Sequence, residues 1–382
     1  MRYDPIPVTP TLVTWARTRA GYTLEDAVEK LKLTKIAQWE DDTKPDLPSY
    51  PQIEKMADAF KVPIAVFFFP EPPDLPSINE TFRTLGSEQF KLIPPRIHLL
   101  LRKAKAFQIS LSELHNGRNP AECLITRDLS FQPQVSIDTI AKDVREYLNI
   151  SLEKQFSWRD NATALKNWRK AFLNVGVYVF KDQFLQRGFS GFCLYDDEFP
   201  IIYVNNTTAE TRQIFTLFHE LAHLLFHTSG VDMVDDYYIT MLPENQERIE
   251  VICNQLAARL LVPEDDFERF SNGEPASETT AEKLAALFNV SREVIFRKFL
   301  DQKLISESDY NRAAKRWADQ KKTGTGGDHY NTKIAYLGTE YIDLAFRQYY
   351  QNRINEAQLA DYLDTKPKNL GNLEEYISRR AP

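Results

Sequence analysis

The sequence predicts an α+β fold that is mostly α-helical. Apolar residues recur at helical spacing through most of the 382 residues, and the strand-like segments are few and short. Those segments are rich in β-branched and aromatic residues and lie at Val175–Phe180, Gly191–Tyr195 and Ile201–Asn205. We therefore expect a small antiparallel sheet within a largely helical chain.

The composition is that of an ordinary globular protein. Hydrophobic residues make up 43% and charged residues 26%, enough for a substantial core in two or three domains. The net charge of −7 argues against nucleic-acid binding by the whole chain. The three cysteines, Cys123, Cys193 and Cys253, are too few and too scattered for a disulfide framework, and none sits in a CxxC, which points to a reducing compartment. Without an apolar leader or a membrane-length apolar run, we expect a cytoplasmic protein that makes no membrane contact.

Proline, glycine and the hydrophobic pattern divide the chain into four expected regions. Residues 1–70 form a helical domain, and 71–173 form a proline-rich connector followed by helices. Residues 174–270 form a compact core that contains the strands. Residues 271–382 form a helical C-terminal region with a flexible glycine-rich linker near 321–328.

The N-terminal region contains short amphipathic segments with clear helix signals. Gly21 ends the first helix, and Thr23 caps the second. The stretches Thr23–Ala27, Ile36–Glu40 and Tyr50–Pro63 resemble the Cro/CI (XRE) helix-turn-helix domain. The resemblance implies an N-terminal domain of that fold.

The resemblance also implies contact with DNA through residues 11–60. Candidate contacts to DNA or to a partner are Lys32, Lys35 and Gln38. The turn before Ile36 is about two residues shorter than in that family, which would shorten or re-aim the recognition helix. Residues 1–70 carry nine basic and ten acidic side chains, a net charge of −1, which is unlike a DNA-binding surface. A helix-turn-helix fold that contacts protein is the alternative.

The pattern HExxH lies in a run of helix-forming residues, Phe215–Gly230, with no Pro and no Gly before its end. His219 and His223 are four positions apart, so a helix places both imidazoles on one face, where they can bind one metal ion. Glu220 lies beside that face and can contact a water on the metal. The alternative is a buried core helix whose histidines are satisfied by neighbouring side chains.

A zinc hydrolase needs a third protein ligand and a fourth position for water. His227 is the nearest candidate, but it comes eight residues after His219. The metzincin pattern would require a His at the position of Ser229, so that class is excluded. Glu250 is the better candidate because it begins a second apolar helix, which Pro263 ends.

In the helix predicted at Glu250–Pro263, Glu250 and Asn254 share one face. A carboxylate at this position can complete a gluzincin-like site of two His and one Glu. Asn254 can orient a ligating imidazole through its other ring nitrogen. The alternative is that Glu250 belongs to a solvated acidic first turn that interacts favourably with the helix dipole.

These residues together resemble the ImmA/IrrE-type metallopeptidases. The resemblance covers Gly188–Pro263: a strand-rich lead-in, the segment FTLFHELAHLL and a helix with Glu, Asn and a closing Pro at the family's spacing. Cys253 and Leu256 are mild departures from the Ala and Phe of that helix. In that family, the two His and the later Glu bind zinc, and the Glu of HExxH activates water. The resemblance implies Zn²⁺ bound by His219, His223 and Glu250, with Glu220 as the base.

The sheet and the loop after the HExxH helix supply further candidates. An edge strand, for which Ile201–Asn205 is the candidate, can pair with an extended substrate peptide. The hydroxyl of Tyr237 or Tyr238, or the imidazole of His227, could stabilise an oxyanion. The alternative is that 230–245 is a polar surface loop.

The resemblance implies a regulatory zinc endopeptidase that cleaves one protein, such as a repressor or an antitoxin. We expect little activity on generic substrates, because broad proteolysis in the cytoplasm would be harmful. Two other functions stay open. One is a transcriptional regulator that binds operator DNA and uses the zinc core as a sensor; the other is an antitoxin or stress-response protein that binds a partner without cutting it. The oligomeric state is open, with a dimer among the options.

Overall fold

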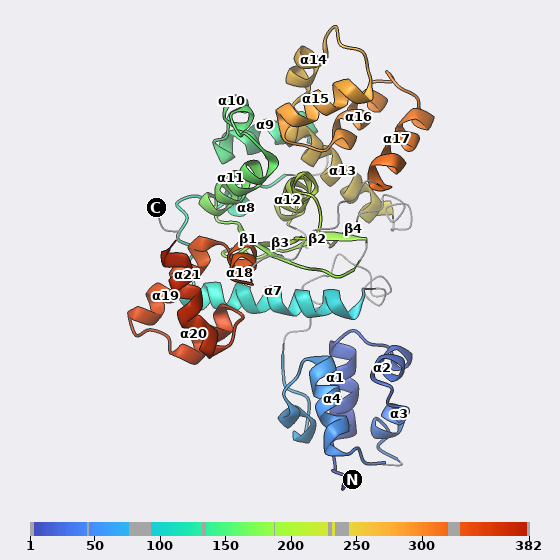
Figure 1. The fold of residues 1–382 in the computed structure, drawn as a ribbon, viewed down its shortest axis with the longest axis vertical. Coiled ribbons are helices and arrows are strands. Elements are labelled where there is room, and N and C mark those ends of the chain that lie inside the picture. Colours follow the sequence, from blue (N-terminus) through green and yellow to red (C-terminus); the bar gives the residue numbers. More distant parts are fainter. Residues whose placement is uncertain are drawn as a thin grey trace. The chain divides into compact units, whose positions relative to one another are not determined.

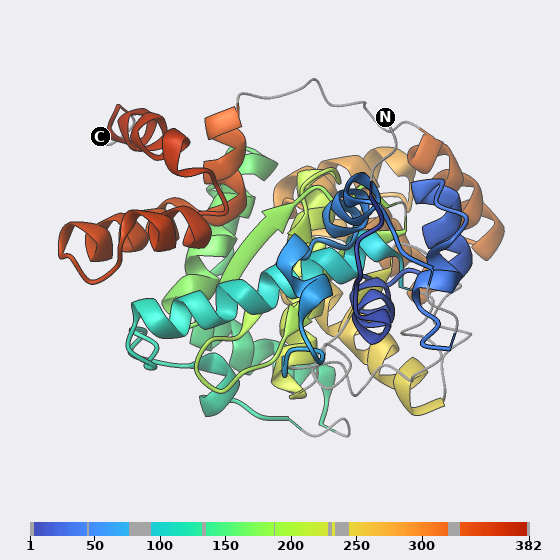
Figure 2. The same cartoon turned by 90° about the horizontal axis from the view of Figure 1, so that it is seen from below.

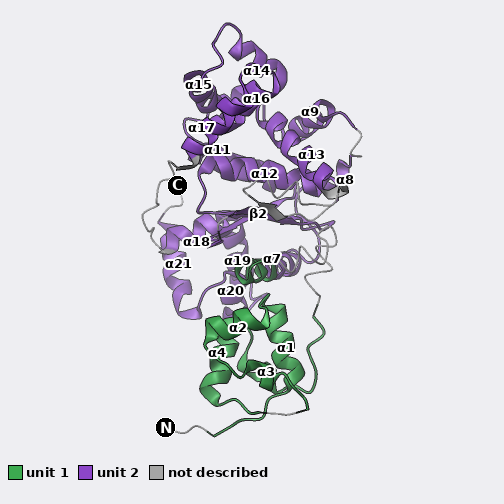
Figure 3. Ribbon diagram, turned by 90° about the vertical axis from the view of Figure 1, so that its right-hand side faces the viewer, with its two compact units in different colours: residues 1–103 green, residues 104–382 purple. Residues whose placement is uncertain are grey.

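The structure, a computed structural model, describes residues 4–43, 46–75, 93–131, 135–186, 188–227, 231–233, 244–319 and 329–379. The chain divides into two compact units, Met1–Lys103 and Ala104–Pro382 (Figure 3). The predicted class is confirmed: the architecture is α+β, mostly helical, with one small sheet (Figure 1). In the described parts of the chain, no helix has both the length and the apolar character needed to cross a membrane.

Unit 1 is a bundle of short helices. They are α1 (Pro10–Arg19), α2 (Leu24–Leu31), α3 (Ile36–Trp39), α4 (Tyr50–Phe60) and the 3-10 helix η1 (Ile64–Phe68). Thr23 caps α2, since its hydroxyl oxygen accepts a hydrogen bond from the backbone N–H of Asp26 at 3.0 Å. Trp39 and Phe60 fill the centre of the bundle and are 1% and 0% exposed. The stretches Thr23–Ala27, Ile36–Glu40 and Tyr50–Pro63 overlap α2, α3 and α4, while the helix-turn-helix resemblance stays a prediction.

Unit 2 contains the sheet and the remaining helices. The long helix α7 (Pro95–Leu114) begins in unit 1 and ends in unit 2. The helices before the sheet are α8 (Ile125–Asp128), α9 (Ile137–Leu148), α10 (Leu152–Phe156) and α11 (Asn161–Asn174). Those after the first three strands are α12 (Glu210–Leu225), α13 (Glu244–Leu261), α14 (Glu264–Ser271), α15 (Glu278–Phe288), α16 (Arg292–Asp301) and α17 (Glu307–Asp319).

The sheet has the strand order β1-β3-β2-β4. Its strands are β1 (Tyr178–Asp182), β2 (Phe189–Leu194), β3 (Ile201–Asn205) and β4 (Val231–Met233). β2 pairs antiparallel with β3 and with β4, but β1 pairs parallel with β3, so the sheet is mixed rather than antiparallel throughout. The prediction that Ile201–Asn205 is an edge strand is wrong, because β3 lies between β1 and β2. Its continuous apolar run, buried on both faces, is typical of an interior strand.

Helices cover both faces of the sheet (Figure 1). On the face of α7, the ring of Phe107 stacks on Phe180 of β1 with centroids 4.5 Å apart. On the opposite face, α11 and α12 pack together, and the ring of Phe218 meets Trp168 edge-to-face at 4.7 Å. Trp158 and Trp168 are 6% and 1% exposed, as expected of core residues. The HExxH helix therefore lies in the centre of unit 2, between the sheet and other helices.

The C-terminal helices lie beside the C-terminal end of α7 (Figure 2). They are α18 (His329–Leu337), α19 (Thr339–Tyr350), α20 (Glu356–Tyr362), the 3-10 helix η3 (Pro367–Asn369) and α21 (Leu370–Ser378). The side-chain amide of Gln348 donates a hydrogen bond to the carbonyl oxygen of Leu114 at 2.9 Å. Arg169 of α11 donates to the carbonyl oxygen of Ala335 at 2.9 Å. These contacts join the C-terminal segment to the core of unit 2. The linker predicted near 321–328 lies outside the described residues.

Candidate metal centre

α12 holds the HExxH residues inside the protein. Its apolar side chains Ile214, Leu217 and Leu221 are all 0% exposed and belong to the main core. Every residue from Thr216 to Leu225 is buried, so the helix is enclosed on all sides, as expected of a helix in the centre of a domain. His219 and His223 are only 1% and 3% exposed. The apolar flanks of the motif thus carry both imidazoles into the interior, as the sequence predicts.

α13 presents Glu250 and Asn254 to α12. Cys253, Leu256 and Ala257 of α13 are each 0% exposed and pack in the same core. Glu250 and Asn254 are one helical turn apart, so they lie on the same side of α13. Packing of the two helices therefore brings residues distant in sequence to the face that bears the two histidines.

Three potential ligand groups converge between α12 and α13. Nε2 of His219 lies 3.1 Å from Nε2 of His223 and 3.2 Å from Oε2 of Glu250. Nε2 of His223 lies 3.2 Å from Oε1 of Glu250. Within the described residues, these three side chains form a cluster whose donor atoms all lie within 4.8 Å of one another. The structure brings together the three residues that the sequence predicts as ligands.

The spacing and chemistry of these atoms fit a tetrahedral zinc ion. Ligand atoms about 2.0–2.1 Å from zinc, at the tetrahedral angle, lie about 3.3 Å from each other. The observed separations are 3.1–3.2 Å. Two imidazole nitrogens and one carboxylate are also a donor set that zinc accepts while keeping a position for solvent. The residues present therefore suit zinc.

Asn254 contacts the other ring nitrogen of His219. Nδ1 of His219 lies 3.0 Å from Oδ1 of Asn254. An amide oxygen only accepts hydrogen bonds, so His219 donates from Nδ1, and in the neutral ring Nε2 carries the lone pair. That lone pair is on the nitrogen that faces His223 and Glu250. This is the contact expected of a residue that orients a metal-binding imidazole.

The two imidazoles also keep the Glu250 carboxyl group ionised. Burial by itself would raise the pKa of Glu250, but in the metal-free protein His223 and His219 hold that pKa well below its usual range where their Nε2–H groups donate to its oxygens. When a metal binds, the same nitrogens would present their lone pairs to it instead. A metal ligand must be deprotonated before it binds, so an ionised carboxylate is ready to receive a cation. Its negative charge also offsets part of the cost of placing a divalent ion in a buried position.

Glu220 lies on α12 against the sheet. It follows His219 directly, about 100° further around the helix, and is 0% exposed. A Cβ atom built on Gly191 of β2 would lie 3.5 Å from Oε1 of Glu220. The carboxyl group therefore lies beside β2. Glu220 directly follows His219 in sequence, but it lies on a different face of α12 from His219 and His223.

The sequence also predicts that His227, Tyr237 or Tyr238 could stabilise an oxyanion. His227 lies just beyond α12 with a positive φ of 54°, and its exposed ring stacks on Tyr195 with centroids 4.9 Å apart. His227 is not a member of the described ligand cluster, and its role at an oxyanion stays a prediction. Tyr237 and Tyr238 lie outside the described residues.

The candidate contacts in unit 1 lie on its surface. Lys32 and Gln38 are exposed, and Lys35 forms an ion pair with Asp46 at 2.6 Å. Both Lys35 and Gln38 belong to the region of α3, a helix of only four residues. That α3 is the recognition helix of a helix-turn-helix stays a prediction. The contact role of these three residues stays a prediction.

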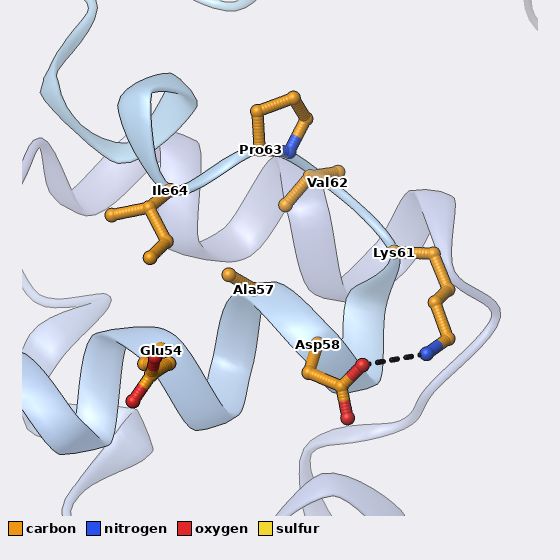
Figure 4. A pocket seen from close by; sticks show the side chains of 7 residues that line it. All are labelled: Glu54, Ala57, Asp58, Lys61, Val62, Pro63 and Ile64. Atoms are coloured by element: carbon orange, nitrogen blue, oxygen red, sulfur yellow. Dashed lines mark hydrogen bonds and ion pairs between the residues drawn. The ribbon is translucent and has the colours of Figure 1, made fainter. Parts of the chain in front are cut away.

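Unit 1 also contains an open pocket at the end of α4 (Figure 4). Lys61 and Asp58 pair across its rim at 2.7 Å. It is lined by Glu54, Ala57, Asp58, Lys61, Val62, Pro63 and Ile64. None of the residues predicted to bind metal contributes to it, so the pocket is separate from the candidate centre.

Sequence reasoning missed the close contact between β2 and α12. Thr216 of α12 and Gly191 of β2 meet beside Glu220. One signal was present: a Gly inside a strand otherwise rich in aromatic residues often marks a close approach of another group. Which group approaches, however, depends on tertiary packing that the local pattern does not encode.

The comparison with known families agrees with this geometry. Residues 174–299 match the family model Peptidase_M78, described as an IrrE N-terminal-like domain. The match spans the strands, α12 and α13, and it supports the ImmA/IrrE-type family for this region and a metallopeptidase-type regulatory function in general. The match does not include unit 1. No curated protein matches the chain.

Proposed function

We propose, on the premise of the family match at 174–299, that this chain is a zinc-dependent endopeptidase that cleaves a specific protein, such as a repressor or an antitoxin. The convergence of His219, His223 and Glu250 carries the proposal. The two imidazoles are buried and the Glu250 side chain is 16% exposed, and their nitrogen and oxygen atoms lie 3.1–3.2 Å apart. That is the spacing of ligand atoms around one zinc ion, so it supports a metal ion bound by all three.

The chemistry follows from the position of each side chain. His219, His223 and Glu250 hold the ion, and Asn254 keeps the ring of His219 in the binding orientation. When bound, zinc lowers the pKa of a coordinated water and polarises the substrate carbonyl. The Glu220 carboxylate accepts the proton of the attacking water and returns it to the leaving amide nitrogen.

Narrow specificity fits the burial of Glu220. A carboxylate that is 0% exposed cannot meet a substrate until the atoms around it move. This supports the expectation of low activity on generic peptides and of cleavage that depends on one partner or signal. We further propose that the protein acts in the cytoplasm. Its three cysteines are few and are free thiols, as expected in a reducing compartment.

The test combines metal content with cleavage. The zinc-loaded full chain is incubated with a library of cellular proteins, and new peptide termini are identified by mass spectrometry. We expect a small set of cleavages from the wild type and none from Glu220→Gln, with equal zinc in both. Glu282→Gln on α15, an exposed site, is the matched control. Identical termini from the wild type and Glu220→Gln would reject the peptidase proposal.

We also propose that unit 1 contacts protein rather than reading DNA. The observation that favours this is the four-residue length of α3, too short to place several side chains along a major groove. The ion pair of Lys35 with Asp46 further reduces the charge available for phosphates. The check is binding of random-sequence duplex DNA across a salt series. A steep decrease of affinity with salt would instead support the operator-binding regulator.

A further inference from the structure

β2 and α12 are in direct contact beside Glu220, with the strand backbone facing helix side chains. A Cβ on Gly191 would lie 2.4 Å from Cγ2 of Thr216, closer than real Cβ contacts come. It would also lie 3.0 Å from the carbonyl oxygen of Tyr203 and 3.5 Å from Oε1 of Glu220. A side chain at Gly191 therefore requires the Thr216 side chain, or the backbone of the helix or strand beside it, to shift.

The contact continues along one face of α12. Arg212, Thr216 and Glu220 follow at intervals of four residues, so they lie one above another on the helix. Arg212 donates a hydrogen bond to the hydroxyl oxygen of Ser190 at 3.1 Å. Ser190 therefore contacts Arg212, while Gly191 lies against Thr216 and Glu220.

The strand is irregular at this place. In the pairing of β2 with β4, the register shifts between Phe189 and Gly191, which leaves Ser190 as an extra residue. Such bulges change the direction in which a strand presents its residues and are common beside active sites. At the bulge, the consecutive residues Ser190 and Gly191 both lie opposite α12.

The metal-binding face of α12 is supported differently. His219 is held by Asn254 and faces Glu250, and His223 also faces Glu250, so both rings have partners on α13. Glu220 instead has β2 next to its carboxyl group. A change in the spacing of β2 and α12 should therefore move Glu220 more than it moves the two histidines.

We infer that Gly191 is a positioning residue: by allowing β2 to touch Thr216, it sets the place of the Glu220 carboxylate relative to the metal ligands. The inference rests on the proposed function for its catalytic meaning, but the structural claim stands separately. A displacement of about 1 Å in a reacting group can lower a rate by about 100-fold. A methyl group added at Gly191 would meet Cγ2 of Thr216 at 2.4 Å, so atoms beside Glu220 must move to admit it.

The test uses Gly191→Ala together with a variant that restores space. Thr216→Ser removes Cγ2, the atom in the 2.4 Å contact, and keeps the hydroxyl, so Gly191→Ala/Thr216→Ser should relieve most of the strain. Relief is partial because the carbonyl oxygen of Tyr203 remains 3.0 Å from the added atom. Gly371→Ala on α21 is the matched control, since a Cβ there has no atom within 4 Å among the described residues.

The first readout needs no substrate. Crystal structures of the zinc-loaded full-length variants give the position of Oε1 of Glu220 relative to Nε2 of His219 and His223. We expect a displacement of about 0.5–1 Å in Gly191→Ala, with wild-type zinc content, and recovery in the double variant. If Gly191→Ala fails to fold, Thr216→Ile presses on the same contact from the helix side and replaces it.

The second readout is cleavage of the substrates found with the wild type. Gly191→Ala should lower kcat by about 10–100-fold with little change in KM, and the double variant should recover most of that loss. A Glu220 carboxylate that stays in place in Gly191→Ala would overturn the inference, as would a loss of cleavage that the second substitution does not relieve. If the wild type cleaves nothing, the proposed function fails, but the displacement of Glu220 still decides the positioning claim.

Discussion

Unit 1 and the α12–α13 region were both predicted from helix patterns and family resemblance, yet their polar groups are arranged very differently. In unit 1, charged side chains pair with one another, as Arg17 does with Glu40 at 2.6 Å, where both side chains are 11% exposed. Between α12 and α13, His219, His223 and Glu250 instead converge on one point. The first arrangement stabilises a fold, and the second also creates a place for a ligand.

The difference shows what a sequence resemblance can support. Helices in the right order establish that a bundle forms, but many functions use the same bundle. Buried donors that converge from separate helices carry more information, because folding does not require them and their burial is costly. Each prediction below tests whether the two regions differ in this way, beginning with the largest expected effect.

Loss of a ligand should have the largest effect. His223→Ala or Glu250→Ala removes one of three donors, so zinc affinity should fall by more than the roughly 10–100-fold typical of an outer partner. Cleavage should disappear with the metal. Competition with a chromophoric chelator measures the affinity. His227→Ala is the control and should keep its zinc, because His227 lies outside the ligand cluster. Full zinc occupancy in Glu250→Ala would remove Glu250 from the ligand set.

Glu220→Gln should separate chemistry from metal binding. A general base contributes about 10²–10⁴-fold to a rate, so cleavage should fall by that factor while zinc affinity stays unchanged. The amide has nearly the shape of the carboxyl group but cannot accept the proton. Steady-state kinetics on an identified substrate provide the measurement. If zinc is lost together with activity, Glu220 supports the metal rather than the proton transfer.

Asn254→Ala should weaken zinc binding without abolishing it. The substitution removes the acceptor for Nδ1 of His219, so the ring is free to change tautomer and orientation. Loss of such an outer partner costs about 10–100-fold in metal affinity. The chelator competition used for the ligand variants measures it. Asn272→Ala, which lies at the end of α14, is a matched control; an equal loss there would point to a general effect on stability.

Lys181 provides a buried charge in unit 2 that is not part of the ligand cluster. Burial lowers its pKa to about 7; Arg169 lowers the pKa as well, and Glu210 opposes them. The pKa of Lys181 is lower in the folded protein than in the unfolded chain. Between pH ~7 and ~10 the unfolded chain therefore binds more protons, and the unfolding free energy rises with pH.

Lys181→Met should remove this dependence, which amounts to at most about 1.4 kcal/mol per pH unit. The variant should therefore be more stable than the wild type near pH 7, with the gain shrinking as pH rises. Chemical denaturation at several pH values gives the unfolding free energies. The same pH slope in both proteins would show that Lys181 keeps its ordinary pKa in the folded state.

The smallest effect is expected in unit 1. Arg17→Met leaves the Glu40 carboxylate, which is 11% exposed, without its guanidinium partner. The unfolding free energy of unit 1 should fall by about 2 kcal/mol, with no change in zinc affinity. Lys61→Met breaks a solvent-exposed pair and should have no measurable effect. A change in zinc affinity in Arg17→Met would show that unit 1 influences the metal region.

Local signals were enough to predict the helices and the convergence of His219, His223 and Glu250. HExxH fixes the relative position of His219 and His223 through helix geometry alone, and the apolar face of α13 determines where Glu250 points. The arrangement of the strands in the sheet was harder to predict from the sequence. The pairing of β1 with β3 is a long-range choice, so neither the mixed sheet nor the interior place of β3 could be read from alternation or turns.

The contact at Gly191 was out of reach for the same reason. A glycine in a strand indicates that something comes close, but only the packing of β2 on α12 shows that Thr216 and Glu220 are the neighbours. The helices of unit 1 were also predicted correctly, although their pattern gives no way to choose between DNA and protein as the partner. The structure therefore adds most to the sequence-based predictions at contacts between secondary-structure elements.

The most direct test of the proposed zinc site is a crystal structure of the wild-type chain grown with zinc, with anomalous data at the zinc edge. We expect one zinc ion about 2.0–2.2 Å from Nε2 of His219, Nε2 of His223 and a carboxylate oxygen of Glu250, with solvent at a fourth position. An anomalous peak elsewhere, or a fourth protein ligand that excludes solvent, would contradict it.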